Sequence, residues 1–472
     1  MTTQQANLSS DPHRRSSRKA WLRLTLRRSQ QEAVASSAMS ATSDNFFNAF
    51  ALFLGASLLQ MGWVSGLPQL FGAFSQLLSV WIASYYRRRH FIVLVASAQT
   101  LVVVGLAALA ALSGSDSVWV FITLAMLYQC GLNLIQPHWR AWMGSLVPPR
   151  RRGTFFAART RLSMLASLAV FLLGGGILSV TTHIGMTWLG FSLLFGAAAI
   201  GRLVSAKLLW HMHDPDPHHP RVPGLFTRTV RQYREAMKDR TFRQYSLFIA
   251  SMNAMVAISA PFFAVYMLQN LQFTYFEYVL TNVVSVATQF VTLGYWGRFS
   301  DRYGNRLVIR VTSCLLPFLP LLWVFSSDFI YILAIQAISG FCWAGFSLST
   351  ANYLYDIRPF RTDFASYAAL QSSLSAAFVF VGALTGGMIA AQADVHISSL
   401  NWHWLSEAVF VVFISSSLLR ALVTLWFVPR LIEPHVRPRP KLLKIIFRVR
   451  GFNAISGLVL DWLTVVRRKN GD

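Results

Sequence analysis

The sequence predicts an all-α membrane protein in which twelve transmembrane helices form two pseudo-symmetric six-helix bundles. Three observations support this prediction. Hydrophobic residues make up 54% of the 472-residue chain and charged residues only 13%, whereas about 25% is usual in soluble domains. Twelve stretches are apolar over the roughly 20 residues that a helix needs to cross a bilayer. All 42 Lys and Arg residues lie in or beside alternate connectors, as in proteins whose basic loops face the cytoplasm.

The apolar stretches also give the order of the spans and their orientation. The basic connectors place both termini in the cytoplasm, and the even number of spans agrees with this. We expect the protein in the plasma membrane, the inner membrane of a bacterium. The predicted spans are 43–64, 67–86, 91–112, 118–139, 162–182, 186–209, 244–267, 276–296, 307–325, 329–353, 365–390 and 408–429.

A long polar connector divides the spans six and six. The predicted parts are a basic N-terminal tail (1–40), a first bundle (41–210), a linker (211–243), a second bundle (244–430) and a basic amphipathic C-terminal tail (431–472). The sixth span contains Phe195 and Arg202, and the twelfth contains Phe413 and Arg420 at the same spacing. This repetition indicates two related halves, which is typical of transporters whose substrate site lies between the repeats.

The connector after the eighth span, "GRFSDRYGNR", has the most specific local pattern: Gly297, Asp301, Arg302, Gly304 and Arg306. Its glycines permit a tight turn. The carboxylate of Asp301 can face the positive N-terminal end of a helix, and both arginines can pair with acids or carbonyls. An ordinary charged turn is the alternative interpretation.

With these residues the chain resembles the major facilitator superfamily, whose cytoplasmic signature is G-x-x-x-D-R-x-G-[RK]-[RK], although Asn305 replaces one basic residue. The resemblance extends over residues 41–430. It fails after the second span, where "ASYYRRRH" keeps Arg87, Arg88 and Arg89 but lacks the aspartate and the glycines. The resemblance implies a conformational latch at residues 297–306 and alternating access by two bundles that rock about a central site. We expect a monomer.

In such a fold the first, fourth, seventh and tenth spans line the cavity. Their amides and aromatic rings favour a neutral or amphipathic small solute, while hydrogen bonding between helices is the alternative role for each residue. The candidate substrate-binding residues are Asn48, Gln60, Gln129, Asn133, Gln136, Asn253, Tyr266, Trp343 and Asn352.

Acidic residues limit the choice of a coupling mechanism, because no Asp or Glu falls at the midpoint of a predicted span. Asp44 is expected at the cytoplasmic start of the first span and Glu277 at the outer start of the eighth. If a coupling ion is used, these two are the candidates, but interfacial solvation is favoured for both. Arg202 and Arg420 either bind an anionic substrate or, as favoured, extend to the inner headgroups.

Other basic segments indicate contact with lipid. The C-terminal tail is an amphipathic pattern suited to an anionic leaflet, and the cations flank spans rather than forming a face that binds nucleic acid. The linker histidines His211, His213, His218 and His219 match no fixed metal motif, so we expect no metal and no cofactor.

The predicted function is secondary active transport of a small solute, with uptake and efflux equally allowed. No phosphate-binding loop and no HExxH or GxSxG pattern indicates an enzyme. The alternative is a membrane sensor or a lipid-interacting scaffold that does not transport.

Overall fold

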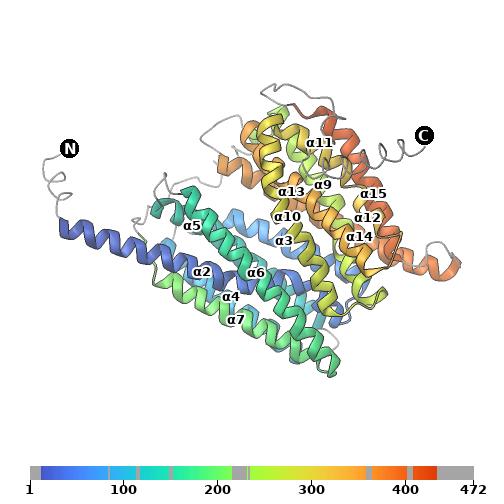
Figure 1. Ribbon diagram of the computed structural model, residues 1–472, viewed down its shortest axis with the longest axis horizontal. Helices are drawn as coiled ribbons and strands as arrows, with labels where there is room; N and C mark the ends of the chain where they lie inside the picture. The colour runs from blue at the N-terminus through green and yellow to red at the C-terminus, as the bar shows by residue number, and fades with distance from the viewer. Residues whose placement is uncertain are drawn as a thin grey trace, which may run out of the picture.

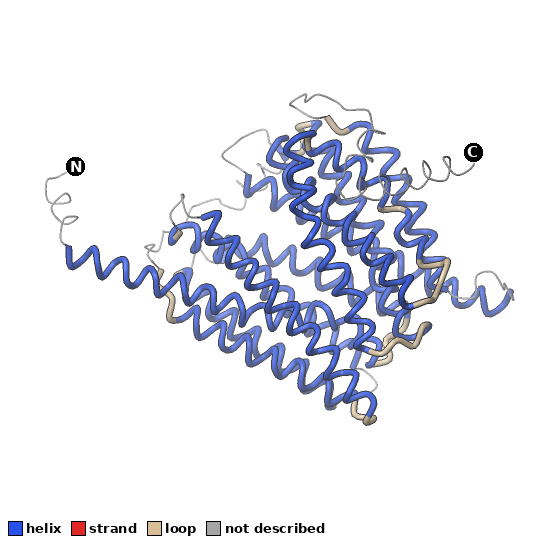
Figure 2. The backbone as a smooth tube through the Cα atoms, viewed as in Figure 1, coloured by secondary structure: helices blue, strands red, loops and turns tan. Residues whose placement is uncertain are grey.

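The computed structural model describes residues 12–82, 86–112, 117–147, 152–214, 231, 234–357, 364–400 and 408–432. Within these ranges the chain is almost entirely helical, with short turns and no strand (Figure 2). Most of the linker, His218 and His219 included, and the predicted amphipathic tail beyond residue 432 lie outside the described residues. The predicted domain limits therefore stay predictions.

The first half of the chain contains six long helices, one for each predicted span. They are α2 (Pro12–Phe53), α3 (Leu58–Ile82), α4 (Arg88–Ala111), α5 (Ser117–Leu146), α6 (Arg152–His183) and α7 (Thr187–Trp210).

The second half follows the same plan, except that the ninth span is divided between two short helices. Its elements are α9 (Arg240–Val265), η2 (Tyr266–Asn270), α10 (Tyr275–Tyr303), α11 (Asn305–Leu315), α12 (Phe318–Leu322), α13 (Phe329–Ile357), α14 (Phe364–Leu400), α15 (Ala408–Phe427) and η3 (Val428–Arg430). Within the described residues, nine helical segments are long and apolar enough to cross a membrane; α2, α3 and α10 do not meet that criterion.

The predicted limits of the first span were wrong. The helix α2 begins at Pro12, ends at Phe53, and is followed by a turn in which Gly55 has a positive φ of 78°. Ser57 and Gln60 then bond each other's backbone N–H groups at the start of α3. The sequence does not reveal this turn, because the residues around it are apolar and the mean hydropathy does not fall there.

The earlier end of the first helix changes the position of Asp44 within it. Asp44 precedes the end of α2 at Phe53 by nine positions, or about 13–14 Å along a helix. The hydrocarbon core of a bilayer is about 30 Å thick. Counted from the end of α2, the carboxylate is thus about half a bilayer thickness along the helix, whereas the predicted limits had placed it at the start of the span.

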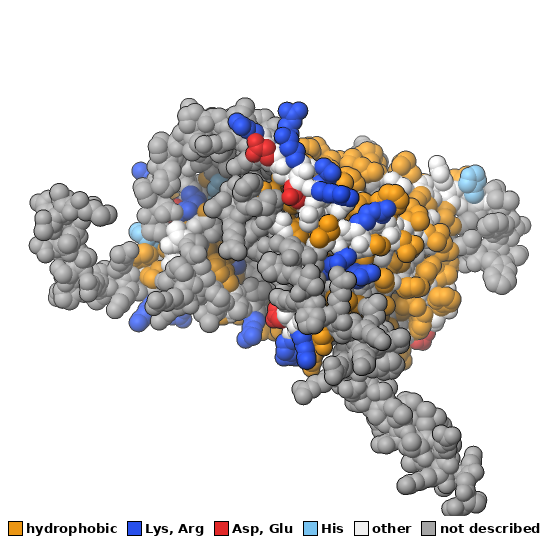
Figure 3. Space-filling model, turned by 90° about the horizontal axis from the view of Figure 1, so that it is seen from above, with side chains coloured by type: hydrophobic (Ala, Val, Ile, Leu, Met, Phe, Trp, Pro, Cys, Tyr) orange, Lys and Arg blue, Asp and Glu red, His pale blue; other side chains and the backbone are white. Residues whose placement is uncertain are grey.

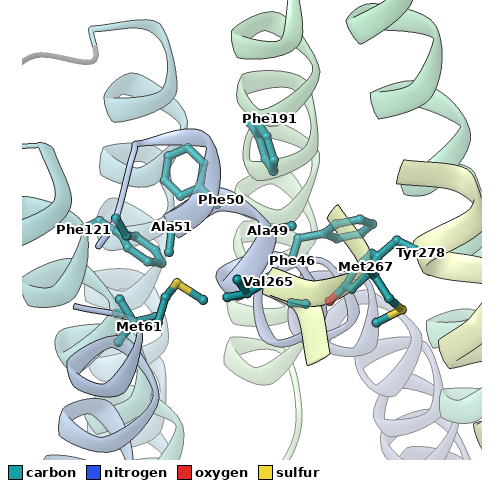
Figure 4. Packing of buried hydrophobic residues seen from close by; sticks show 14 of the residues in the cluster. Phe46, Ala49, Phe50, Ala51, Met61, Phe121, Phe191, Val265, Met267 and Tyr278 are labelled. Carbon is teal, nitrogen blue, oxygen red and sulfur yellow. The ribbon is translucent and has the colours of Figure 1, made fainter. Parts of the chain in front are cut away.

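The two halves share one hydrophobic core, at the end where α2 stops and α3 begins. Phe46 and Ala49 of α2 belong to the same buried cluster as Val265, Met267 and Tyr278 of the second half (Figure 4). Here α3 packs on α14, and α6 packs on α10. The contact is close: Gly62 approaches Ala383 so nearly that a Cβ on it would lie 2.6 Å from the Ala383 carbonyl oxygen.

At the opposite end each half has a core of its own. One buried cluster, which includes Trp142 and Met212, is formed by the first half alone. Another, which includes Phe242 and Tyr353, is formed by the second half alone. The helices of the halves diverge in this direction, from the lower right toward the upper left of Figure 1. In the described residues the halves are thus joined at one end and separate at the other.

The outer flanks of the bundles are apolar, as a surface in contact with lipid must be. Leu101, Leu112, Phe325, Ile330 and Leu425 are each more than 70% exposed. In the view of Figure 3 hydrophobic side chains cover one flank, and Lys and Arg side chains lie beside it.

Candidate functional site

Asp44 is the centre of the candidate site. Its side chain is exposed, although Ser43 and Phe46 beside it on α2 are fully buried. Asn48, one helical turn further on, is half-buried, and residues four apart share a helix face. The Tyr278 hydroxyl donates to the Asn45 carbonyl at 3.2 Å, which fixes this turn of α2 to the second half. Asp44 therefore lies at the border of the shared core, on the side toward which the halves diverge.

Behind Asp44 the first half contains buried polar groups. The fully buried hydroxyl of Tyr128, on α5, lies within electrostatic range of the carboxylate of Asp44. Neither this hydroxyl nor that of Ser43 has a hydrogen-bond partner among the described residues. The guanidinium of Arg202, on α7, acts electrostatically on the same tyrosine. Tyr128 thus lies between the exposed carboxylate and a buried cation.

Arg202 continues this line of polar groups toward the separated end. Its side chain is 2% exposed, and its Nη1 donates to Ser205 Oγ at 3.3 Å. Ser205 Oγ donates to Glu32 Oε1 at 3.1 Å, and Glu32 Oε2 forms an ion pair with Arg159 at 2.8 Å. We call the residues Asp44, Tyr128, Arg202, Ser205, Glu32 and Arg159 the polar chain. The favoured expectation that Arg202 extends to the headgroups was wrong, because Glu32 and Ser205 hold it inside the bundle.

The polar chain is balanced in charge. Two carboxylates, Asp44 and Glu32, are matched by two guanidinium groups, Arg202 and Arg159. Asp44 and Glu32 are twelve positions apart on one continuous helix, which corresponds to about 18 Å. Charges in a membrane bundle are usually paired in this way because an unpaired charge is costly there.

The second half repeats the framework of this site without its acids. Ser259 and Phe263 of α9 have the spacing of Ser43 and Phe47 of α2, and Ala260 takes the place of Asp44. The predicted repetition in the sixth and twelfth spans also appears in space. Phe195 packs on Phe47, with 6.3 Å between ring centroids, and Phe413 packs on Phe263 at 4.6 Å.

Arg420 is the counterpart of Arg202 and is equally buried, at 2% exposed. Its Nη2 donates to Ser259 Oγ at 2.7 Å and its Nη1 to the Leu316 carbonyl at 3.3 Å. The expectation of headgroup contact was wrong for this residue too. Its hydrogen-bond partners are neutral, whereas the negative charge of Glu32 acts on Arg202.

Most of the predicted cavity residues are accessible on α2, α5, α9 and α13. They are Asn48, Gln129, Asn133, Gln136, Asn253, Trp343 and Asn352, each half-buried or exposed. On α5 the Asn133 Nδ2 donates to the Gln129 carbonyl, and both side chains face Gly72 of α3. These two amides therefore lie against a neighbouring helix of their own half.

Two predicted cavity residues and one predicted coupling residue have other surroundings. Tyr266 is 3% exposed and packs among Trp323, Phe410 and Phe413 in the core. Gln60 caps α3, as described above. The Glu277 carboxylate accepts from the backbone N–H and the hydroxyl of Thr274 in a capping box at the start of α10.

The signature turn forms the junction of α10 and α11 at the separated end. Gly304 has a φ of 90° and donates its N–H to the Ser300 carbonyl at 2.8 Å. Asp301 and Arg302 are exposed, and Arg306 Nη2 donates to the Pro429 carbonyl at 3.3 Å. A Cβ added at Gly297 would meet only Leu348, at 3.8 Å, which is an ordinary contact.

One arginine after the second span has an acidic partner, although this connector lacks the usual aspartate. Arg88 Nη2 pairs with Asp214 Oδ1 at 2.5 Å, and Asp214 comes from the beginning of the linker. Trp142 Nε1 donates to the His213 carbonyl at 3.1 Å, and the rings of Trp21 and His213 pack at a tilt with 4.3 Å between their centroids. Residues 211–214 are thus attached to the first half.

Sequence reasoning missed Glu32, Tyr128 and Ser205. Glu32 was assigned to the basic tail, although it is one of only two acids among the first 40 residues. That rarity was the available signal. Tyr128 and Ser205 had none, because their roles depend on contacts between helices far apart in the sequence.

Comparison with known proteins identifies the fold. The family model described as "Major Facilitator Superfamily" matches residues 33–279 and 245–467, so it is found twice and covers most of the chain. The chain belongs to the major facilitator superfamily. It is therefore a multi-pass membrane transporter, and the superfamily resemblance seen in the sequence is confirmed. No curated protein matches the chain in sequence.

Solved structures of the superfamily share its architecture at low identity. The nucleoside transporter NupG has a TM-score of 0.66 at 12% identity, covering 85% of this chain and 98% of that one. An auto inhibited POT family peptide transporter has 0.65 at 15%, covering 88% and 99%. A bacterial homolog of the human lysosomal transporter Spinster has 0.59 at 14%, covering 88% and 99%. At these identities the similarity shows the superfamily fold alone.

Proposed function

We propose that this transporter is a secondary carrier of a small solute that works by alternating access. The observation that carries the proposal is the arrangement of the halves, which share a core at one end and have separate cores at the other. Two bodies joined at one end can rock, so that the joined and separated ends exchange. The orientation inferred from the Lys and Arg residues directs the separated end to the cytoplasm, which makes this the inward-facing state.

Asp44 is the proposed coupling residue. It is exposed near the membrane middle, where a carboxylate is retained when it has a function. Tyr128 and Arg202 lie behind it. Protonation of Asp44 would leave Arg202 with less opposing negative charge, so the charge state of the site can bias the packing of α2 against α5 and α7. A proton is therefore the proposed coupling ion.

The proposed substrate is neutral or amphipathic. Asn48 shares a face of α2 with Asp44, while Asn253, Trp343 and Asn352 are partly accessible on α9 and α13. Amides offer both donors and acceptors, and the indole offers an apolar face. Gln129, Asn133 and Gln136 extend this set on α5. The direction of transport is set by the gradients of the solute and of the coupling ion, so both uptake and efflux are allowed.

Asp301, Arg302 and Arg306 form the proposed latch at the separated end. In the state described here Asp301 and Arg302 are exposed. When the halves close at this end, these charges can meet helix ends of the first half. Asp301→Asn should then slow cycling while the folded protein persists.

Transport into liposomes tests the proposal. The purified protein is reconstituted with a pH-sensitive dye inside, and sugars, nucleosides, amino acids and hydrophobic cations are added in turn. We expect one class to move with a proton flux that Asp44→Asn abolishes. Glu235→Gln is the matched control, because Glu235 is exposed and pairs with Arg231 away from the site.

Two results would contradict the proposal. Proton-coupled flux that survives Asp44→Asn removes Asp44 as the coupling residue. If cysteines at Asn48 and Asn352 keep the same labelling rates with every solute, and no solute moves, a sensor or scaffold is favoured.

A further inference from the structure

Cationic and aromatic side chains meet where α4 begins and α7 ends, at the separated end of the first half. The guanidinium of Arg89 lies over the ring of Trp210, with 5.2 Å from its Cζ to the ring centroid. The imidazole of His90 packs edge to face with the same ring, with 5.4 Å between centroids. Lys207 precedes Trp210 by three residues on α7, so the two are neighbours on the helix surface. We call Arg89, His90, Lys207 and Trp210 the flank cluster.

The flank cluster lies at the edge of an apolar surface that contacts lipid. Trp210 is 46% exposed, and His90 and Lys207 are exposed. Leu94 follows His90 by four residues on α4 and is 64% exposed. Leu203 precedes Lys207 by four residues on α7 and is 57% exposed. Residues four apart share a helix face, so the polar side chains adjoin the exposed leucines at the level where headgroups meet acyl chains.

No acid neutralises this cluster within the described part of the chain. The nearby carboxylate of Asp214 pairs with Arg88 instead. Among the described residues the side chains of Arg89, His90 and Lys207 form no ion pair. The contact of Arg89 with an aromatic face orients its guanidinium without using its N–H donors. An oriented guanidinium and an ammonium on neighbouring helices suit a phosphate group.

The corresponding positions of the second half differ. In the twelfth span Leu425 takes the place of Lys207, five residues after the buried arginine of each half. Val428 takes the place of Trp210, eight residues after that arginine. Among the described residues the combination on α4 and α7 thus belongs to the first half alone, and the repeated framework of the fold does not require it.

We propose that the flank cluster binds one anionic glycerophospholipid of the inner leaflet. Arg89 and Lys207 bind its phosphate, His90 and Trp210 supply further donors beside it, and an acyl chain follows the exposed leucines. A free anion would make no use of that apolar surface, which is the reason to assign a lipid. The orientation inferred from the Lys and Arg residues gives the inner leaflet, where anionic lipids attract such cations.

This lipid site lies apart from the basic tails and from the proposed solute site, and it does not depend on the proposed function. Its ligands come from two helices that are far apart in the sequence, α4 and α7. A bound lipid therefore holds these helices together and should stabilise the folded protein.

Lipid-dependent stability tests the proposal. The unfolding temperature of the purified protein is measured in a neutral detergent with increasing dioleoyl phosphatidylglycerol, dioleoyl phosphatidylcholine or inorganic phosphate. Ligands that bind the folded state raise this temperature. We expect a saturable rise of roughly 2–4 °C with phosphatidylglycerol alone. Lys207→Gln should increase the half-saturating phosphatidylglycerol concentration about fivefold, whereas Lys207→Arg, which keeps the charge, should retain the wild-type value.

Arg430→Gln is the matched control. Arg430 also lies over an exposed tryptophan, Trp426, at 4.0 Å. These two residues are only four positions apart, and Arg430 donates to the Trp426 carbonyl, so no second helix contributes. Replacing Arg430 removes the same charge from the protein and should leave the half-saturating concentration unchanged.

Four results would overturn the proposal. They are the absence of a saturable rise with phosphatidylglycerol, an equal response to phosphatidylcholine, saturation by inorganic phosphate, and a Lys207→Gln effect no larger than that of Arg430→Gln. The last result would mean that the lipid is attracted by the total charge and not by the flank cluster. Because Lys207 is exposed, its replacement tests binding without disturbing the core.

Discussion

Replacing Gly62 with alanine should open the joined end of the protein. A Cβ at Gly62 would lie 2.6 Å from the carbonyl oxygen of Ala383, whereas ordinary contacts of a Cβ begin near 3.4 Å. The helices α3 and α14 must therefore separate by about 0.8 Å, the difference between these distances. The obstacle is backbone, which cannot move aside as the end of a flexible side chain can.

Separating these helices raises the free energy of only one state of the proposed transport cycle, the state in which this end is closed. Overpacking a well-packed contact costs about 1–3 kcal/mol. Because α3 and α14 belong to different halves, the state in which this end is open avoids that cost. The equilibrium should then shift toward the open state by a factor of about 5–150.

Thiol labelling measures the shift. Cys130, Cys314 and Cys342 are first replaced by serine, and Ala49, which is fully buried in the shared core, is changed to cysteine as the reporter. An impermeant maleimide added from the outer side should then label the Gly62→Ala variant about 5–150 times faster than its parent.

A second glycine provides the control. A Cβ at Gly176, on α6, would meet no atom within 4 Å, so Gly176→Ala should leave the labelling rate unchanged. An unchanged rate in folded Gly62→Ala would refute the reasoning, as would an equal increase in both variants.

Three further predictions concern stability in detergent. Glu32→Gln should lower the free energy of unfolding by about 3–5 kcal/mol, because it leaves buried guanidinium groups without their acid. Glu235→Gln, in an exposed pair, should change it by less than about 1 kcal/mol. Thermal unfolding compares the two variants. Arg88→Asp and Asp214→Arg should each destabilise the protein, and the double exchange should restore part of the loss if their 2.5 Å contact is an ion pair. Thr424→Val should cost about 1–3 kcal/mol, since it leaves unsatisfied the Ser313 carbonyl to which Thr424 Oγ1 donates at 3.1 Å, and Thr424→Ser should be close to the wild type in the same measurement.

The general architecture was readable from the sequence because the membrane imposes it locally. Each span must be apolar over its own length, and each connector is marked by charge, so neither inference needs contacts between distant residues. The same holds for the turn at Gly304. The repetition of Phe195 and Arg202 in Phe413 and Arg420 was also visible, since duplication preserves spacing.

The candidate site was predicted less well, for two physical reasons. The end of α2 is marked only by a change of backbone direction among apolar residues. The predicted end of the first span was residue 64 instead of Phe53, an error of about three turns, and it placed Asp44 too far from the end of the span. Burial also cannot be read from residue type. Tyr266 and Asn48 both seemed suited to a cavity, but only contacts between helices decide that the tyrosine fills the core.

The length of α2 has a mechanical consequence. This 42-residue helix is about 63 Å long, far more than a membrane requires. Its early part holds the start of the linker, because Arg28 Nη1 donates to the His211 carbonyl at 2.5 Å. A rigid rod that is anchored in the core at one end and holds the tether between the halves at the other acts as a lever. A tilt of a few degrees at Asp44 becomes a displacement of ångströms at the tether, so a probe on exposed Arg23 would report each turnover without touching the solute path.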